Sequence, residues 1–307
     1  MRSTAMVVAV AFGWVTTASA VDWSGVEGRD VALFYPAQMS WELLLTQADH
    51  SGAGKFREGK DCRQCHQGEE AASGALLVAD ATAEPTPIAG KPGAIVATVK
   101  AARDDARLYV RIAFDPGPQP NAGQEPAYAA KVAVMFGDAK APDFVRGGCW
   151  AACHDNLARM PSAASADTTK YLARSRVKMS RTGGAEIKPE AELAAIRADG
   201  GALEYWQARI ALDGSVTAVD GEILDQRREN TAPAVTATVE KDGGGWVVTF
   251  SRPLDAGAGR LSFAPGRTYT LGVSVHAGQT AQRFHYVSLE RTLRLDGGDA
   301  DFVAALR

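Results

Sequence analysis

The residues best suited to chemistry are two cysteines and a histidine in the stretch Cys62-Arg63-Gln64-Cys65-His66. A Cys-x-x-Cys-His sequence is typical of covalent haem attachment. Each thiol adds to one vinyl group of the haem, and the adjacent histidine lies under the ring and binds the iron. The spacing therefore predicts a covalently bound haem c, with His66 as its proximal iron ligand.

A second stretch, Cys149-Trp150-Ala151-Ala152-Cys153-His154, has the same three residue types with one more residue between the cysteines. All four cysteines of the chain belong to these two stretches. Two disulfides would leave both histidines unexplained, and the two stretches offer six ligands where a structural zinc ion takes four. The sequence therefore predicts two covalently bound haem c groups, with His154 as the proximal ligand of the second.

The distal ligand of the first haem has several candidates among the five histidines and the methionines. We expect His50, which lies in a turn-rich segment shortly before the first motif. Met39, His276 and an open iron are the alternatives. The choice affects the redox potential, because a methionine ligand raises it and a second histidine lowers it.

Residues 1–20 have the features of a removable export signal. Arg2 supplies the positive start, residues 5–15 are mostly apolar, and Ala18-Ser19-Ala20 is a small-residue cleavage site. The apolar run is shorter than the about 20 residues that cross a bilayer. We therefore expect a soluble periplasmic protein with no transmembrane segment after cleavage. The formal net charge of −3 predicts no nucleic-acid partner.

The remaining chain is dominated by short strand-like runs separated by turn residues, without alternating helices. This pattern predicts a mainly β fold, an antiparallel β-sandwich with few short helices. We expect an N-terminal c-type haem segment over 21–75 and a β-sandwich c-type haem domain over 76–307. Strands are predicted at 31–36, 95–100, 108–114, 131–136, 203–212, 235–240, 246–251, 268–276 and 284–289, and helical segments at 40–45 and 189–199.

Three C-terminal runs, 243–254, 272–276 and 283–288, resemble the haem-binding domain of the ethylbenzene dehydrogenase gamma subunit. That family includes the haem subunits of molybdenum enzymes related to dimethyl sulfoxide reductase. The resemblance covers roughly residues 75–295. It implies a β-sandwich that holds one haem b through a methionine and a lysine and relays electrons.

The chain departs from that family at both iron ligands. The stretch 147–154 stands in place of the family's methionine, and His285 stands in place of its lysine. The resemblance therefore implies that the ancestral pocket carries the second haem, with His285 as its distal ligand. His276 and Met160 are the alternatives, and Met39, Met135 and Met179 complete the methionines considered. The loss of the two family ligands argues against a molybdoenzyme partner.

Aromatic and basic residues near the motifs have simpler interpretations. We expect Trp150 to pack on a porphyrin. Four basic residues near the first motif fit a solvated face, neutralisation of haem propionates, or a docking patch for an acidic redox partner. They are Lys55, Arg57, Lys60 and Arg63.

Together these features predict electron transfer and no catalytic residues. The expected partners are a membrane cytochrome b or quinol dehydrogenase as donor, and a soluble cytochrome or terminal reductase as acceptor. A haem enzyme or a small-ligand sensor, with an open coordination site at the first haem, is the alternative. Two six-coordinate low-spin haems favour the carrier, and an iron that binds carbon monoxide favours the enzyme or sensor.

Overall fold

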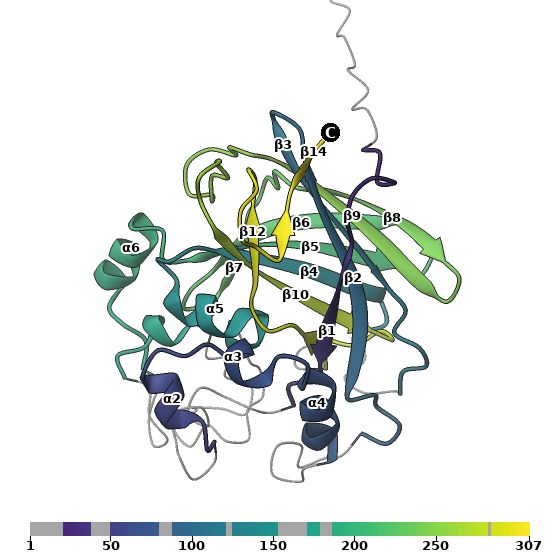
Figure 1. Ribbon diagram of the computed structural model, residues 1–307, viewed down its shortest axis with the longest axis horizontal. Coiled ribbons are helices and arrows are strands. Elements are labelled where there is room, and N and C mark those ends of the chain that lie inside the picture. The colour runs from purple at the N-terminus through teal and green to yellow at the C-terminus, as the bar shows by residue number, and fades with distance from the viewer. Residues whose placement is uncertain are drawn as a thin grey trace, which may run out of the picture.

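The computed structural model describes residues 21–37, 50–79, 88–120, 125–152, 171–178, 186–281 and 284–307. The expected export signal and the helical segment expected at 40–45 lie outside these residues. The described part of the chain is mainly β, as the sequence predicts, with short helices gathered at one end (Figure 1).

Fourteen strands of the described residues belong to one sheet, and all but two of its pairings are antiparallel. The main path runs β7-β6-β5-β4-β10-β11-β1-β2-β3-β9-β8. The strands are β1 (Arg29–Phe34), β2 (Ala94–Arg103), β3 (Arg107–Phe114), β4 (Tyr128–Gly137), β5 (Leu203–Ala211), β6 (Val216–Ile223), β7 (Arg227–Glu229), β8 (Thr236–Asp242), β9 (Gly245–Pro253), β10 (Tyr269–Ala277), β11 (Tyr286–Val287), β12 (Arg291–Arg294), β13 (Phe302–Val303) and β14 (Ala305–Leu306).

The sheet folds over, so that its two ends face each other. β6 contacts β8, and β5 contacts β9, although these strands lie far apart along the hydrogen-bonded path. The main core fills the space between the two halves. Trp206 of β5 meets Phe250 of β9 there, with ring centroids 6.3 Å apart. Burial of these large rings is the main force that holds the halves together.

Strands β4 and β10 are buried on both faces, which explains their nearly continuous apolar sequences. Successive side chains alternate between the faces of a strand. Val134 and Phe136 therefore point into the main core, whereas Met135 points into a second apolar cluster under the helices. That second cluster also contains Cys62, Cys149 and other residues of the two motifs.

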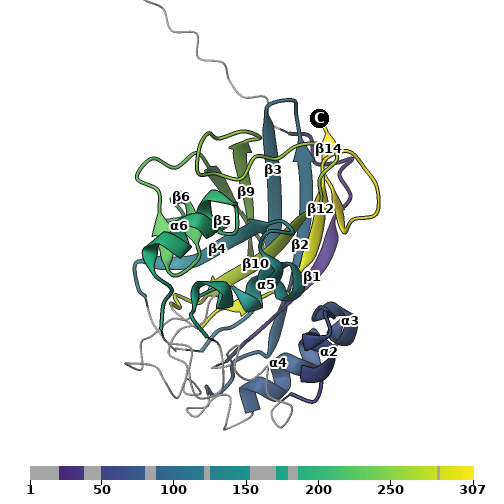
Figure 2. The same cartoon turned by 90° about the vertical axis from the view of Figure 1, so that its left-hand side faces the viewer.

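Helices of the described residues cover this outer face of the sheet. They are α2 (Ala53–Arg57), α3 (Arg63–His66), α4 (Glu70–Ala79), α5 (Pro142–Gly147), η1 (Gly148–Ala151), η2 (Ala173–Ser175) and α6 (Glu190–Ala198). Helices α2, α3 and α4 lie together at the end of the β structure that is opposite the C-terminus (Figures 1 and 2). The first motif and the described start of the second, residues 149–152, therefore lie on this helical side. α6 confirms the helix predicted at 189–199.

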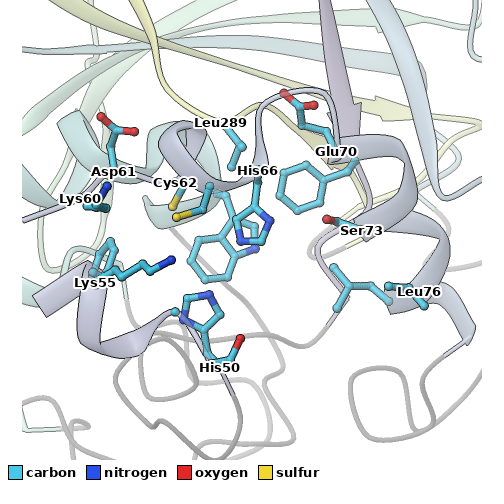
Figure 3. A pocket seen from close by; sticks show the side chains of 17 residues that line it. His50, Lys55, Lys60, Asp61, Cys62, His66, Glu70, Ser73, Leu76 and Leu289 are labelled. Atoms are coloured by element: carbon cyan, nitrogen blue, oxygen red, sulfur yellow. The ribbon is translucent and has the colours of Figure 1, made fainter.

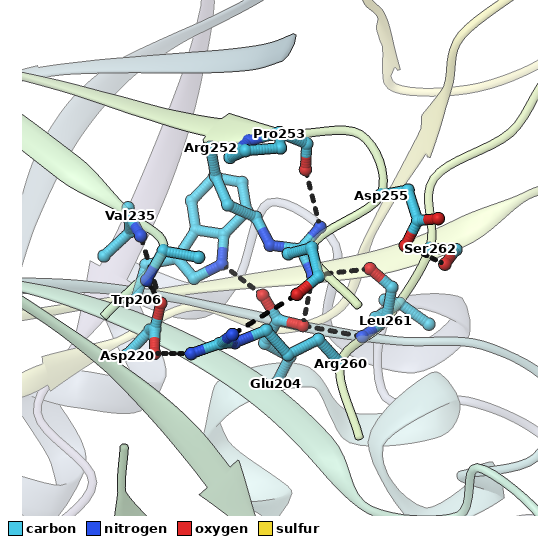
Figure 4. A network of polar contacts seen from close by, with 12 residues as sticks. Glu204, Trp206, Asp220, Val235, Arg252, Pro253, Asp255, Arg260, Leu261 and Ser262 are labelled. Carbon is cyan, nitrogen blue, oxygen red and sulfur yellow. Dashed lines mark hydrogen bonds and ion pairs between the residues drawn. The ribbon is translucent and has the colours of Figure 1, made fainter. Parts of the chain in front are cut away.

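A buried polar network joins the two halves of the sheet (Figure 4). Glu204 of β5 accepts hydrogen bonds from Arg252 of β9 at 2.7 Å and from the Trp206 indole at 2.6 Å. Burial raises the pKa of the Glu204 carboxyl, and the Arg252 guanidinium opposes that shift. A buried charge needs such a partner, because an unpaired one is expensive to desolvate.

Strand β1 connects the N-terminal part of the chain to the sheet. It pairs along its whole length with β2, from Arg29 opposite Val99 to Phe34 opposite Ala94. Phe34 also pairs with Val287 of β11. The segment that carries the first motif therefore begins inside the sheet, between β1 and β2, and is anchored at both ends by neighbouring strands.

Candidate haem-attachment sites

The first motif forms one turn of helix, α3, that starts directly after Cys62. The Cys62 carbonyl accepts hydrogen bonds from the amides of Cys65, at 3.1 Å, and His66, at 2.9 Å. This turn holds both thiols and the imidazole in a fixed relation. Cys62 is buried, Cys65 is exposed, and both are free thiols. Burial raises the pKa of the Cys62 thiol.

The motif opens onto a cavity of about 410 Å³ (Figure 3). His50 and His66 point toward one another across it, with ring centroids 6.1 Å apart and planes inclined by 33°. One metal ion between two imidazoles, at bond lengths of about 2 Å, needs a ring separation of about 6 Å. The His66 Nδ1 atom lies 3.5 Å from Glu69, a contact that can fix the orientation of the ring.

The rest of the cavity wall is largely apolar, and it also includes two lysines and the acidic residues Asp61 and Glu70. Phe34, Phe56, Leu76, Leu77 and Leu289 supply apolar surface. Lys55 and Lys60 line the same cavity. An apolar cavity with cationic residues at its edge suits a flat hydrophobic macrocycle that carries two carboxylates. The donor set and the lining therefore fit a covalently attached haem.

Arg63 does not join the other basic residues at the cavity. Its guanidinium forms a bidentate pair with Asp301, at 2.7 and 2.9 Å. Burial alone would raise the pKa of Asp301, but hydrogen bonds from Arg63 and the Thr292 amide outweigh it, and the pKa lies below its usual value. Arg63 thus ties the first motif to the C-terminal part of the chain, and the solvated-face interpretation does not apply to it.

The second motif begins in η1, packed against strand β10. Cys149 is 1% exposed, and its Sγ lies 3.9 Å from Sδ of Met135. Cys149 also lies against Gly272, where a Cβ atom would come within 2.7 Å of the Cys149 amide. Met135, one of the methionines considered as a ligand, therefore contacts the sulfur of Cys149 itself. Cys153 and His154 lie outside the described residues.

The two motifs lie side by side, although many residues separate them in the chain. The Cys62 amide donates a hydrogen bond of 2.8 Å to the carbonyl of Arg146 in α5. Trp150, from the second motif, lines the cavity of the first. The same apolar cluster contains Cys62, Cys149 and Trp150. The spacing of the motifs in the sequence gives no sign of this contact.

A glycine allows η1 to approach the connection between β11 and β12. Gly148 has φ of +60°, and a Cβ atom there would lie 2.3 Å from the Glu290 amide nitrogen. We expect Gly148→Ala to destabilise the protein by about 3 kcal/mol or more, because strain at positive φ adds to a backbone clash. Chemical denaturation measures the loss.

Gly243 provides the matched control for that substitution. Its φ is +57°, and a Cβ atom there would meet nothing within 4 Å. Gly243→Ala should therefore cost only the strain of positive φ, about 1 kcal/mol. If both variants lost the same free energy of unfolding, the contact between η1 and the β11–β12 connection would contribute nothing to stability.

Two further histidines stack at the far end of β10. The rings of His276 and His285 have centroids 4.7 Å apart and planes inclined by 27°. His285 is buried at 7% exposure, and His276 is half-buried. His276 and Gly272 are four residues apart on β10, so both lie on the same face of the strand. Cys149 packs against that face at Gly272. Met39, Met160 and Met179 lie outside the described residues.

The connection from β11 to β12 contacts both motifs, and sequence reasoning missed it. The Ser288 carbonyl accepts a hydrogen bond from the Trp150 amide at 3.3 Å. Leu289 lines the first cavity, and Glu290 accepts a hydrogen bond from the Arg63 amide at 2.9 Å. The one available signal was the position of these residues just after His285. We refer to residues 288–290 as the linking strip.

The comparisons agree with a haem-carrying class of protein. The chain is 31% identical to cytochrome c-552 of Stutzerimonas stutzeri over 310 residues, which cover 99% of this chain and 98% of that protein. It is 27% identical to cytochrome c-551 of Rhodocyclus tenuis over 293 residues, 93% and 99% of the two chains. The chain belongs to the family of c-type cytochromes that includes cytochrome c-552. It is thus an electron carrier with covalently bound haem c.

Other comparisons add little. No protein-family model matches the chain. Two solved structures of a family 9 carbohydrate-binding module from Caldicellulosiruptor kristjanssonii, with cellotriose and with glucose, have TM-scores of 0.28 and 0.30 at 12% identity. They cover 64% of this chain and 65% and 66% of theirs. In the described residues, no helix has the length and apolar character needed to cross a membrane.

Proposed function

We propose that the protein is a periplasmic dihaem c-type cytochrome that passes electrons between a donor and an acceptor through two adjacent haems. The observation that carries the proposal is the opposition of His50 and His66 at 6.1 Å across the first cavity. Two imidazoles at this separation favour a six-coordinate iron, which suits electron transfer better than ligand binding.

At the first site, Cys62 and Cys65 would hold the haem, and His66 and His50 would bind its iron. A bound haem supplies a one-electron couple at its iron. Lys55 and Lys60 lie where their charges can neutralise the haem propionates. The apolar part of the lining lowers the local dielectric, which strengthens charge interactions beside it.

At the second site, we propose attachment through Cys149 and Cys153, with His154 and His285 as the iron ligands. His285 is buried near the end of β10, on whose outer face Cys149 packs. The resemblance to the ethylbenzene dehydrogenase gamma subunit remains our hypothesis for the origin of this pocket. In that resemblance, His285 stands at the position of the family's haem-ligating lysine.

The contact between the motifs supports transfer inside one molecule. Trp150 follows an attachment cysteine of the second site and forms part of the wall of the first. A hydrogen bond from Cys62 to Arg146 fixes α3 against the helix that precedes the second motif. Electrons can therefore move between the sites through packed side chains, without domain motion.

The expected partners follow from this role and from the export signal expected over residues 1–20. A membrane cytochrome b or quinol dehydrogenase would supply electrons, and a soluble cytochrome or terminal reductase would accept them. The haem enzyme and the gas sensor remain alternative outcomes. Both require an open iron at the first site, where His50 lies opposite His66.

The test is the haem count and coordination of the exported protein. We expect mass spectrometry to show two covalently bound haems and no residues 1–20. We expect both irons to be low spin and to bind no carbon monoxide at neutral pH. A single haem would contradict the dihaem proposal, and rapid carbon monoxide binding by the native protein would favour the enzyme or sensor.

A further inference from the structure

Glu290, in the linking strip, is a buried carboxyl group that neither attachment nor ligation uses. Its side chain is 6% exposed, although it borders a second cavity of about 440 Å³ next to the first motif. One oxygen, Oε1, accepts a hydrogen bond from the Arg63 amide at 2.9 Å. The other, Oε2, is buried and has no hydrogen-bond partner among the described residues. A buried polar atom without a partner needs an explanation.

The position of Glu290 places it beside both motifs. Its carboxyl binds the amide that directly follows Cys62. Its own backbone amide lies against Gly148, directly before Cys149. A charge on this carboxyl therefore acts at short range on Cys62 of the first motif, and it lies beside the start of the second.

On these grounds, and given the proposed dihaem function, we infer that Glu290 takes up a proton when the protein accepts an electron and releases it on oxidation. The balance is one electron and one proton per Glu290. The electron comes from the redox donor. The proton comes from the solvent, through the second cavity that Glu290 borders, and forms the O–H bond of the Glu290 carboxyl. No other bond forms or breaks.

The sign follows from electrostatics. A ferric haem has one net positive charge on iron and porphyrin, which favours a nearby carboxylate. A ferrous haem has none, so the neutral acid becomes more favourable. Burial raises the pKa of Glu290 to about 8, despite the hydrogen bond from the Arg63 amide. The carboxyl therefore titrates near neutral pH, well above the range of an ordinary glutamate.

Several charged groups face Glu290 or its immediate neighbours, and most of them have hydrogen-bond or ion-pair partners of their own. Arg63 is held by Asp301, and Arg291 is held by Glu70 at 3.3 Å. Asp61, which also borders the second cavity, accepts two hydrogen bonds from Gln64. Among the described residues, strand β10 contributes only Thr270 to this cavity. The charged groups around the site are Asp61, Arg63, Glu70, Arg146, Arg291 and Asp301.

The experiment is a spectroelectrochemical titration of the intact holoprotein at a series of pH values. Since the reduced protein binds the proton more tightly, the midpoint potential of at least one haem should fall as pH rises. The limiting slope is about 59 mV per pH unit for one proton and one electron. In Glu290→Gln this slope should disappear, because glutamine keeps the oxygen that accepts the Arg63 hydrogen bond but cannot ionise. Glu290→Asp should restore a slope.

Asp61→Asn is the matched control. This substitution removes a carboxylate from the same cavity. The midpoint potential should therefore change by a similar amount at all pH values, and its slope against pH should remain. If the Glu290→Gln variant does not accumulate, measurements on the wild-type protein still test whether Glu290 takes up a proton. Its reduction should take up protons detectable with a pH indicator, and infrared difference spectra should show a new protonated carboxyl band.

A pH-independent potential in the wild type, or an unchanged slope in Glu290→Gln, would overturn this inference. Neither result would bear on the dihaem carrier, which the haem count and carbon monoxide test address separately. Conversely, a protein without two reversible haem couples would contradict the proposed function before any pH dependence was measured.

Discussion

Replacing His50 with alanine should convert the first haem from low spin to high spin. The variant loses the imidazole that faces His66 at 6.1 Å, and a methyl group in its place is too short to reach the iron and has no atom to donate to it. We expect about half of the haem absorbance to change and carbon monoxide to bind the ferrous protein rapidly, because one of the two irons acquires an open position. Optical and electron paramagnetic resonance spectra measure the change.

Two further substitutions make the test of His50 specific. Ser51→Ala alters the neighbouring residue of the same cavity wall and should leave both spectra as they are. His50→Met should return the first haem to low spin with a higher potential, because a thioether favours the ferrous state. If His50→Ala keeps the native spectrum, the distal ligand is another group, and Met39 is the first to replace.

His285→Ala should have the same effect on the second haem. His285 is buried at 7% exposure, and it lies three residues before Ser288, where the linking strip begins. Its loss should make that haem high spin and leave the first haem low spin, so that the changes of His50→Ala and His285→Ala add in the double variant. The same spectra measure it.

His276→Ala is the natural control, since its ring stacks on that of His285 at 4.7 Å. If His285 is the ligand, His276→Ala should preserve the low-spin spectrum and change the potential modestly. A high-spin second haem in His276→Ala, together with a native spectrum in His285→Ala, would exchange the roles of the two residues.

The strands of this fold were predictable because their side chains alternate or are β-branched and turn residues separate them. β2 and β3, with Asp104 in the turn between them, follow the sequence closely. The strands β7, β12, β13 and β14 were missed, because two to four residues carry no periodic signal. The eight-residue strand β6 was missed as well, because Asp220 and Gly221 interrupt its apolar pattern. Helix α4 was also missed. Its alanine-rich sequence is interrupted by Gly74, which approaches the Gly93 carbonyl too closely for any side chain.

The chemistry of the first motif was readable from the types and spacing of Cys62, Cys65 and His66. The cavity could not be predicted from the sequence. Phe34 of β1 and Leu289 of the linking strip line it, and only the folded sheet brings these residues close to the motif. The role of Arg63 illustrates the same limit. Because Arg63 is close to Lys60 in the sequence, the spacing suggested that the two charges belong to one basic surface patch. Arg63 instead pairs with Asp301, a contact between residues far apart in the sequence that the sequence does not reveal.

The burial of the attachment sulfurs has a consequence for biosynthesis. Cys149 is 1% exposed and Cys62 is 8% exposed, so an enzyme could not reach either thiol in the folded chain. Burial also holds the Cys62 thiol protonated by raising its pKa, and the protonated form adds slowly to an alkene. If these two thiols carry haem as we propose, thioether formation must precede closure of the sheet, while the maturation machinery can still reach both thiols.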